Sequence, residues 1–292
     1  MRTGLEGVGD MAYILPTVFR QSVPPRSRNI CAGNAGAGVA KILRYRAESA
    51  LPQEAQGCCP GVNESVPACR QARKIVNKNA LAERVLHVLR QRYPETGPHL
   101  RAASPWQLLV ATILSAQCTD ARVNAVTPAL FARWSGPEQT ARAGLDELED
   151  AVRSTGFFRM KARNLLQTAR RIMEVYGGEV PADFAALVTL PGVARKTANV
   201  VLWGAFGINE GLAVDTHVAR ISRRLGLTDA RDADKIEQDL LVLFPRAEWG
   251  DVNHRMVSFG RDVCRARAPR CGQCELLADC PRRGVDTLHK IG

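Results

Sequence analysis

The amino-acid sequence predicts an all-α fold, and three observations support that prediction. Apolar residues recur at helical spacing along most of the chain after Asn79, and proline and glycine interrupt the pattern at intervals. No tight turn is flanked by the alternating apolar residues that a β-hairpin needs. The chain has 292 residues, of which 46% are hydrophobic, so it can bury a substantial core.

The first predicted helix starts at Asn79 and stops before Pro94. Leu81, Val85 and Leu89 recur every fourth residue, which places them on one face of a helix. Asn79 can cap the first turn through its side chain, and Pro94 cannot continue a helix.

The second predicted helix, 106–117, opens at Ser104 and Pro105, because proline is tolerated in the first turn of a helix. Gly156 and the pair at 177–178 separate later helices. The remaining predicted helices are 121–134, 145–154, 161–176, 183–189, 196–206, 216–225, 234–244 and 252–264.

Residues 1–76 lack this periodicity, and we expect a disordered N-terminal extension there. A start codon assigned too far upstream and an arginine-rich organelle-targeting segment are the alternatives. Glu6, Asp10 and Pro16 interrupt the first apolar residues, which argues against a secretory signal. Since no apolar run approaches the 18 or more residues of a membrane helix, we expect an intracellular protein without a membrane partner, in the cytoplasm and nucleoid if bacterial.

The net charge of the chain is +11, which suggests an anionic partner such as a nucleic acid. However, residues 1–78 contain 11 basic and 5 acidic residues and so contribute more than half of that excess. A basic tail alone would explain the number about as well, so charge is weak support for nucleic-acid binding by the folded part.

Four of the nine cysteines gather near the C-terminus, and without a secretory signal such a cluster indicates a metal site rather than disulfides. Zinc is one candidate, although zinc sites usually pair two Cys-x2-Cys motifs and this cluster has one. The clustered cysteines are Cys264, Cys271, Cys274 and Cys280, and the scattered ones are Cys31, Cys58, Cys59, Cys69 and Cys118.

Leu190, Pro191 and Gly192 predict a tight turn between two helices. Amides at the start of the second helix then point outward, where they can hold a phosphate oxygen. Taken alone, the turn is equally consistent with an ordinary connection between helices.

Residues 190–201, which read LPGVARKTANVV, closely resemble the helix-hairpin-helix motif of the endonuclease III family. The resemblance extends to LSAQCTD at 114–120, to GFF at 156–158 followed by Lys161, and to VDTH at 214–217. These segments keep the family's order over some 200 residues. Ala194 departs from the pattern, because the family usually has glycine there, and its methyl group could crowd a bound phosphate.

The resemblance implies a two-lobed helix-hairpin-helix DNA glycosylase fold. A six-helix domain would span 98–208, and 77–97 together with 209–292 would form a second domain around a [4Fe–4S] cluster. By the same resemblance, Cys264, Cys271, Cys274 and Cys280 would hold the cluster, in a structural role.

The implied activity is that of a bifunctional DNA glycosylase and AP lyase of base excision repair, which removes oxidised or ring-saturated pyrimidines. Lys196 would attack the sugar and form a Schiff base, and Asp215 would cap its helix and stabilise the cationic sugar. A lysine ammonium has an ordinary pKa of about 10.4, so we expect the flipped nucleotide to desolvate the amine. The partner would be double-stranded DNA with damaged bases or abasic sites, bound by a monomer.

Further residues are expected to contact DNA. Gln117 and Phe157 match family positions that probe the opened base stack, and three arginines lie between the first two clustered cysteines. The predicted DNA-binding residues are Gln117, Phe157, Leu190, Gly192, Ala194, Arg265, Arg267 and Arg270.

Two alternatives remain open at this point. An adenine-specific mismatch glycosylase shares the core but normally lacks a lysine at the position of Lys196 and has a large C-terminal recognition domain. A non-catalytic DNA-binding module would keep the hairpin and the cysteines, but the presence of both Lys196 and Asp215 argues against it.

Overall fold

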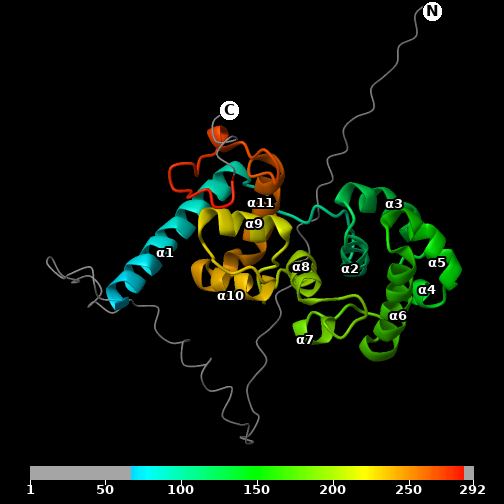
Figure 1. Ribbon diagram of the computed structural model, residues 1–292. Helices are drawn as coiled ribbons and strands as arrows, with labels where there is room; N and C mark the ends of the chain where they lie inside the picture. The colour runs from blue at the N-terminus through cyan, green and yellow to red at the C-terminus, as the bar shows by residue number, and fades with distance from the viewer. Residues whose placement is uncertain (1–66, 286–292) are drawn as a thin grey trace, which may run out of the picture. The chain divides into compact units, whose positions relative to one another are not determined.

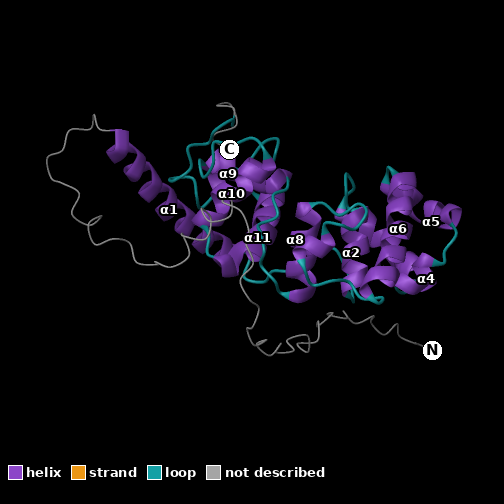
Figure 2. Cartoon of the chain, turned by 90° about the horizontal axis from the view of Figure 1, so that it is seen from below, coloured by secondary structure: helices purple, strands orange, loops and turns teal. Residues whose placement is uncertain are grey.

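The computed structural model describes residues 67–285, and within them every regular element is a helix (Figure 2). The predicted all-α class is therefore confirmed for this part of the chain. Most of the predicted N-terminal extension, with its expected disorder and the organelle-targeting alternative, lies outside the described residues. No described helix is both long enough and apolar enough to cross a bilayer.

The helices follow one another along the chain with short connections (Figure 1). Those from α1 onward belong to one compact unit that begins at Pro67. The helices are α1 Pro67–Arg92, α2 Pro105–Leu114, α3 Asp120–Arg133, α4 Pro137–Ala141, α5 Leu145–Val152, η4 Arg153–Thr155, α6 Phe158–Tyr176, α7 Phe184–Leu187, α8 Arg195–Phe206, α9 Thr216–Leu225, α10 Ala233–Leu243, η5 Arg246–Glu248, α11 Trp249–Asp262 and η6 Cys271–Gln273.

Helix α1 begins at Pro67, earlier than the predicted start at Asn79. The expected domain boundary at 76 therefore falls inside a helix. The added segment, PACRQARKIVNK, has only two strongly apolar residues, Ile75 and Val76, so its apolar period is weak. It is nevertheless rich in alanine, arginine, lysine and glutamine, which favour helix intrinsically, and proline suits the first turn.

The predicted helices differ from the observed ones at two further places. The helix expected at 106–117 ends at Leu114, and the three residues that follow form a turn in which Gln117 has a φ of 50°. Helix α4 was not predicted because its 5 residues are too few to show a hydrophobic period.

Side-chain caps start several helices where the sequence places a short polar residue. The Ser104 hydroxyl accepts a hydrogen bond from the amide of Gln107 at 3.2 Å, and Thr119 and Asp232 cap α3 and α10 in the same way. These caps satisfy amides that have no partner within the helix, which fixes where each helix begins.

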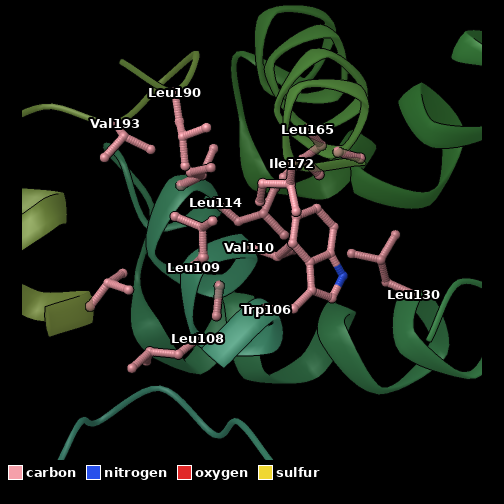
Figure 3. Packing of buried hydrophobic residues seen from close by; sticks show 14 of the residues in the cluster. Trp106, Leu108, Leu109, Val110, Leu114, Leu130, Leu165, Ile172, Leu190 and Val193 are labelled. Carbon is pink, nitrogen blue, oxygen red and sulfur yellow. The ribbon is translucent and has the colours of Figure 1, made fainter. Parts of the chain in front are cut away.

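A first hydrophobic cluster surrounds α2, whose residues from Leu108 to Leu114 are all buried (Figure 3). Trp106, 4% exposed, packs beside Leu165 and Ile172 of α6 in this cluster. Because α2 is apolar around its whole circumference, it has to be covered on all sides. Helices α3, α6 and α8 pack against it and provide that cover.

A second hydrophobic cluster combines α1 with the helices that follow residue 210. Its fully buried members include Val85 of α1, Ile221 of α9, Ile236 of α10 and Met256 of α11. Residues from the two ends of the described chain thus share one core, which no local pattern in the sequence reveals.

Helices α8 and α11 approach closely and join the two clusters. At Gly250 an added Cβ atom would lie 1.9 Å from the Trp203 ring, so only glycine fits at this contact. The same ring stacks on His254 of α11, with ring centroids 4.5 Å apart. The last turn of α8 is therefore held against α11, which belongs to the second cluster.

Candidate active site and cysteine pocket

The turn between α7 and α8 has the hairpin geometry that its sequence predicts. Gly192 has a φ of 78°, a conformation that side chains disfavour. A Cβ atom there would lie 2.7 Å from Nδ2 of Asn164 on α6, so the turn also needs glycine for space. Leu190 is buried, and the Thr168 hydroxyl donates to the Pro191 carbonyl oxygen at 2.8 Å, which anchors the turn to α6.

Ala194 is the N-cap residue of α8 and is exposed. Its φ of −91° is open to any residue, so the backbone does not require the glycine that the family usually has. The α8 N-terminus has no capping side chain, in contrast to α2, α3, α9 and α10. Its first amides therefore face outward, together with the positive end of the helix dipole.

Lys196 is the second residue of α8, and its side chain is exposed. The neighbouring Arg195 turns away toward α10, where its guanidinium lies 3.2 Å from a carboxylate oxygen of Glu237. Arg195 also lies over the ring of Phe184, 5.1 Å from its centroid. The charge of Arg195 is thus balanced by an acid instead of acting mainly on Lys196.

Asp215 is the N-cap residue of α9 and is mostly buried, with 15% of its side chain exposed. Its Oδ1 atom accepts hydrogen bonds from the amides of His217 and Val218, each at 2.8 Å, and its Oδ2 atom lies 3.2 Å from Nδ1 of His217. Burial alone would raise the pKa of this carboxyl group. The hydrogen bonds and the charge of Lys196 outweigh burial and hold the pKa below its ordinary value.

The structure therefore brings Lys196 and Asp215 within electrostatic reach of each other, from the N-termini of two helices. Within the described residues Asp215 makes its close contacts with His217 and Val218, and no ion pair joins it to Lys196. An exposed amine beside a buried, ionised carboxylate is an arrangement that can attack an electrophilic carbon and stabilise a nearby cation.

Gln117 and Phe157 are both exposed, and both have left-handed backbone angles, with φ of 50° and 46°. Phe157 is 62% exposed, although a large apolar side chain normally gains by burial. Such angles are costly for residues other than glycine and often mark functional sites.

The four clustered cysteines line one pocket that opens to solvent. All four are half-buried, and none forms a disulfide bond. Burial raises the pKa of the Cys274 thiol to about 11 and also raises the pKa of Cys280. Within the described residues, no three histidine, cysteine, aspartate or glutamate side chains gather closely enough to hold a metal ion.

Donors surround these sulfur atoms. The guanidinium of Arg224 lies 3.5 Å from Sγ of Cys264, and the amide of Arg282 donates to Sγ of Cys280 at 3.4 Å. Donors of this kind stabilise thiolate ligands. The cysteines do not converge on one point as a single-ion site requires, but they line a shared pocket, so they fit a larger thiolate-bound group.

The three arginines between Cys264 and Cys271 are exposed but differ in their contacts. Arg265 donates to the Asp262 carbonyl oxygen at 3.2 Å, and Arg270 lies 3.5 Å from the Asp262 carboxylate. Among the described residues Arg267 has no acidic partner, which leaves its charge available to a ligand.

Sequence reasoning missed two arginines of α9 that hold this loop. Arg224, only 8% exposed, donates to the carbonyl oxygens of Arg265 and Ala266 at 2.6 and 2.9 Å. Arg220 donates to the carbonyl oxygen of Cys264 at 3.0 Å. The i, i+4 spacing places both arginines on one face of α9, but no local pattern in the sequence shows that this face points inward.

Comparisons with known proteins agree with this geometry. Residues 110–246 match the model of the HhH-GPD superfamily base excision DNA repair protein family. Endonuclease III of Synechocystis sp. is 51% identical over 209 residues, which cover 72% of this chain and 95% of that protein.

Two solved structures are also similar. A non-covalent endonuclease III–DNA complex is 41% identical, with a TM-score of 0.68, and the match covers 70% of this chain and 95% of that one. A trapped endonuclease III–DNA covalent intermediate has the same identity and TM-score, with 70% and 96% covered. With these findings the predicted resemblance is confirmed: the chain belongs to the endonuclease III family, the bifunctional DNA glycosylases and AP lyases of base excision repair.

Proposed function

We propose that Lys196 is the nucleophile of this glycosylase. Its Nζ atom attacks C1′ of the damaged nucleotide, the bond from C1′ to the base breaks, and the base leaves with a proton. The sugar ring then opens to a Schiff base on the lysine, and loss of a C2′ proton breaks the C3′–O bond of the strand. The observation that supports this role is that Lys196 lies within electrostatic reach of the ionised Asp215, each at the start of a helix.

Asp215 would act on the sugar. Its carboxylate is held in place by the amides of His217 and Val218, so it needs no reorganisation as positive charge develops at C1′. Because Lys196 is exposed in the free protein, the bound nucleotide has to exclude water from the amine.

The proposed partner is double-stranded DNA with an oxidised or ring-saturated pyrimidine or an abasic site, bound by a monomer inside the cell. The hairpin of Leu190, Gly192 and Ala194 would bind a phosphate at the uncapped start of α8. Gln117 and Phe157 would fill the space that the extruded nucleotide leaves, since both are exposed.

Arg265, Arg267 and Arg270 would bind the DNA backbone. Arg267 is the most available of the three, because Arg265 donates to backbone carbonyls and Arg270 lies beside the Asp262 carboxylate. Two lobes would share the DNA, one formed by 98–208 and the other by 77–97 with 209–292. The membership of the two hydrophobic clusters supports that division, and helix α1 extends the second lobe back to Pro67.

The endonuclease III family is known to have an iron–sulfur cluster, and we propose that this chain holds a [4Fe–4S] cluster in the cysteine pocket. The four lining thiols, Cys264, Cys271, Cys274 and Cys280, would be its ligands, with Arg224 donating to Cys264. When bound, the cluster would supply a covalent brace for the loop between Cys264 and Cys280. Base release and elimination need no change of oxidation state.

Borohydride trapping tests the central role of Lys196. An oligonucleotide with one oxidised thymine is incubated with the protein and borohydride, and the covalent adduct is measured on a denaturing gel. We expect the wild type to form the adduct and Lys196→Gln to form none. Lys235→Gln, a change at another exposed lysine in the first turn of a helix, is the matched control and should keep the adduct. An adduct that persists in Lys196→Gln would remove Lys196 from the proposed role.

A further inference from the structure

Lys161 is a buried lysine that the proposed chemistry does not use. It lies in the first turn of α6 and is only 2% exposed, so its ammonium is removed from water. Burial lowers the pKa of this group, and the thiol of Cys118 is the titratable group that acts on it. Lysine is rarely buried unless its charge has partners, so a buried ammonium needs hydrogen-bond acceptors nearby.

Two backbone carbonyls hold the ammonium. Nζ of Lys161 donates to the carbonyl oxygen of Leu114 at 2.8 Å and to that of Thr155 at 2.7 Å. Leu114 is the last residue of α2, and Thr155 is the last residue of η4. Carbonyls at helix ends have no partner within the helix and attract cations, so the lysine fits both.

Each of these carbonyls lies shortly before one of the two strained positions in the chain. Gln117 lies three residues after Leu114, and Phe157 lies two residues after Thr155. Both residues have left-handed backbone angles, which persist only where the surrounding structure enforces them. The ammonium of Lys161 thus joins the residues that precede Gln117 to those that precede Phe157.

We propose that Lys161 is a positioning residue that sets the spacing between Gln117 and Phe157, so that the two side chains enter the opened stack together. This inference rests on the proposed roles of those two residues. Lys161 itself touches no DNA in this scheme. Removing its amine would leave two buried carbonyls unpaired and let each segment relax independently.

The test uses Lys161→Met, which keeps an unbranched side chain as far as the Cε position and removes the ammonium donors. Single-turnover base release is measured on two duplexes with the same oxidised thymine. One has adenine opposite the lesion. The other has no base opposite the lesion, so no unpaired partner base has to be held after extrusion. We expect the variant to be slower by about 10- to 100-fold on the first duplex, because small misplacements can cost that much, and far less affected on the second. Equal losses on both duplexes, or no loss on either, would overturn the proposal.

A double-mutant cycle separates positioning from mere stability. Lys161→Met, Gln117→Ala and the double variant are compared on the adenine duplex. If Lys161 acts through Gln117, the double variant should be little worse than the poorer single variant. Fully additive losses would contradict the proposal, because independent sites add.

A control addresses loss of stability. Thr140→Val removes a buried hydroxyl that donates to the carbonyl of Gly136, within α4 and its cap, and leaves both probing segments intact. It should leave the ratio of rates on the two duplexes at the wild-type value. If Lys161→Met does not fold, Lys161→Gln, which keeps an N–H donor on a shorter side chain, should show the same dependence on the opposite base.

Borohydride trapping on a preformed abasic site distinguishes this inference from the proposed function. An adduct in both the wild type and Lys161→Met, with equal losses on the two duplexes, would reject only the positioning role. No adduct in the wild type would reject the proposed function itself.

Discussion

Asp215 shows how one residue serves folding and chemistry at once. Its carboxylate caps α9 through the amides of His217 and Val218, and the same contacts keep it ionised and oriented. The capping role follows from the sequence, because aspartate before a helix is a common cap. The proximity to Lys196 depends on where the tertiary structure places the starts of α8 and α9.

Asp215→Asn separates the two roles, since asparagine caps helices as well as aspartate does. We expect single-turnover base release to fall by roughly 10²- to 10⁴-fold, because the charge and proton transfers at the sugar are lost. DNA affinity, measured by fluorescence anisotropy, should change little. Equal losses in base release and in binding would leave only the capping role.

The pH dependence of stability gives a second readout on the same variant. The pKa of Asp215 is lower in the folded protein than its ordinary value, so the ionised form stabilises the fold above that ordinary value. This contribution is lost as the pH falls through the lowered pKa. The free energy of unfolding, measured with urea, should therefore fall more steeply below about pH 4 for the wild type than for Asp215→Asn.

Backbone strain is concentrated near the proposed sites. Among the described residues, those with positive φ that are not glycine are Gln117, Phe157, Ala268 and Arg282. The first two would probe the base stack, and the last two flank cysteines of the pocket. The sequence suggested the first pair through the family resemblance, but only the three-dimensional structure shows the strain.

At the scale of elements, the hairpin shows how a turn is fixed by the helix beside it. Asn164 and Thr168 of α6 meet the turn at Gly192 and Pro191, so the start of α8 cannot move independently of α6. The Leu-Pro-Gly pattern predicted the turn but not this support.

Gly192→Ala should disturb the hairpin in two ways, through the positive φ and through contact with Asn164. We expect a loss of roughly 1–3 kcal/mol in the free energy of unfolding, measured with urea, and weaker DNA binding. Ala194→Gly is the matched change in the same turn, at a residue whose φ is ordinary and whose side chain is exposed. It should cost less than about 1 kcal/mol. Unchanged stability in Gly192→Ala would show that the turn does not need glycine.

At the scale of the whole molecule, the cysteine pocket lies against the second hydrophobic cluster. Cys264, Cys274 and Cys280 pack against that cluster, which also contains residues of α1. A group bound in the pocket would therefore stabilise contacts between distant parts of the chain.

Metal analysis checks the proposed cluster directly. Protein purified without oxygen should contain about four iron and four sulfide per chain, and Cys271→Ser should lose most of both. Cys118→Ser changes a cysteine that does not line the pocket and should keep them. Zinc in place of iron, in protein from iron-supplied cells, would contradict the proposed cluster.

The sequence by itself determined the helical class, the starts of α2 and α9, the hairpin and the family, because these depend on local spacing and residue type. It missed the start of α1, which has helical propensity but a weak apolar period, and the short α4. Local patterns suffice where a few neighbouring residues decide the outcome.

Tertiary structure alone decided how those pieces meet. Lys161 holds a carbonyl 47 positions away, and Arg224 holds one 41 positions away. Whether a charged side chain faces water or a distant carbonyl depends on the packing of whole helices, since burial of a charge is favourable only where partners have already been assembled. No pattern within a single helix contains that information.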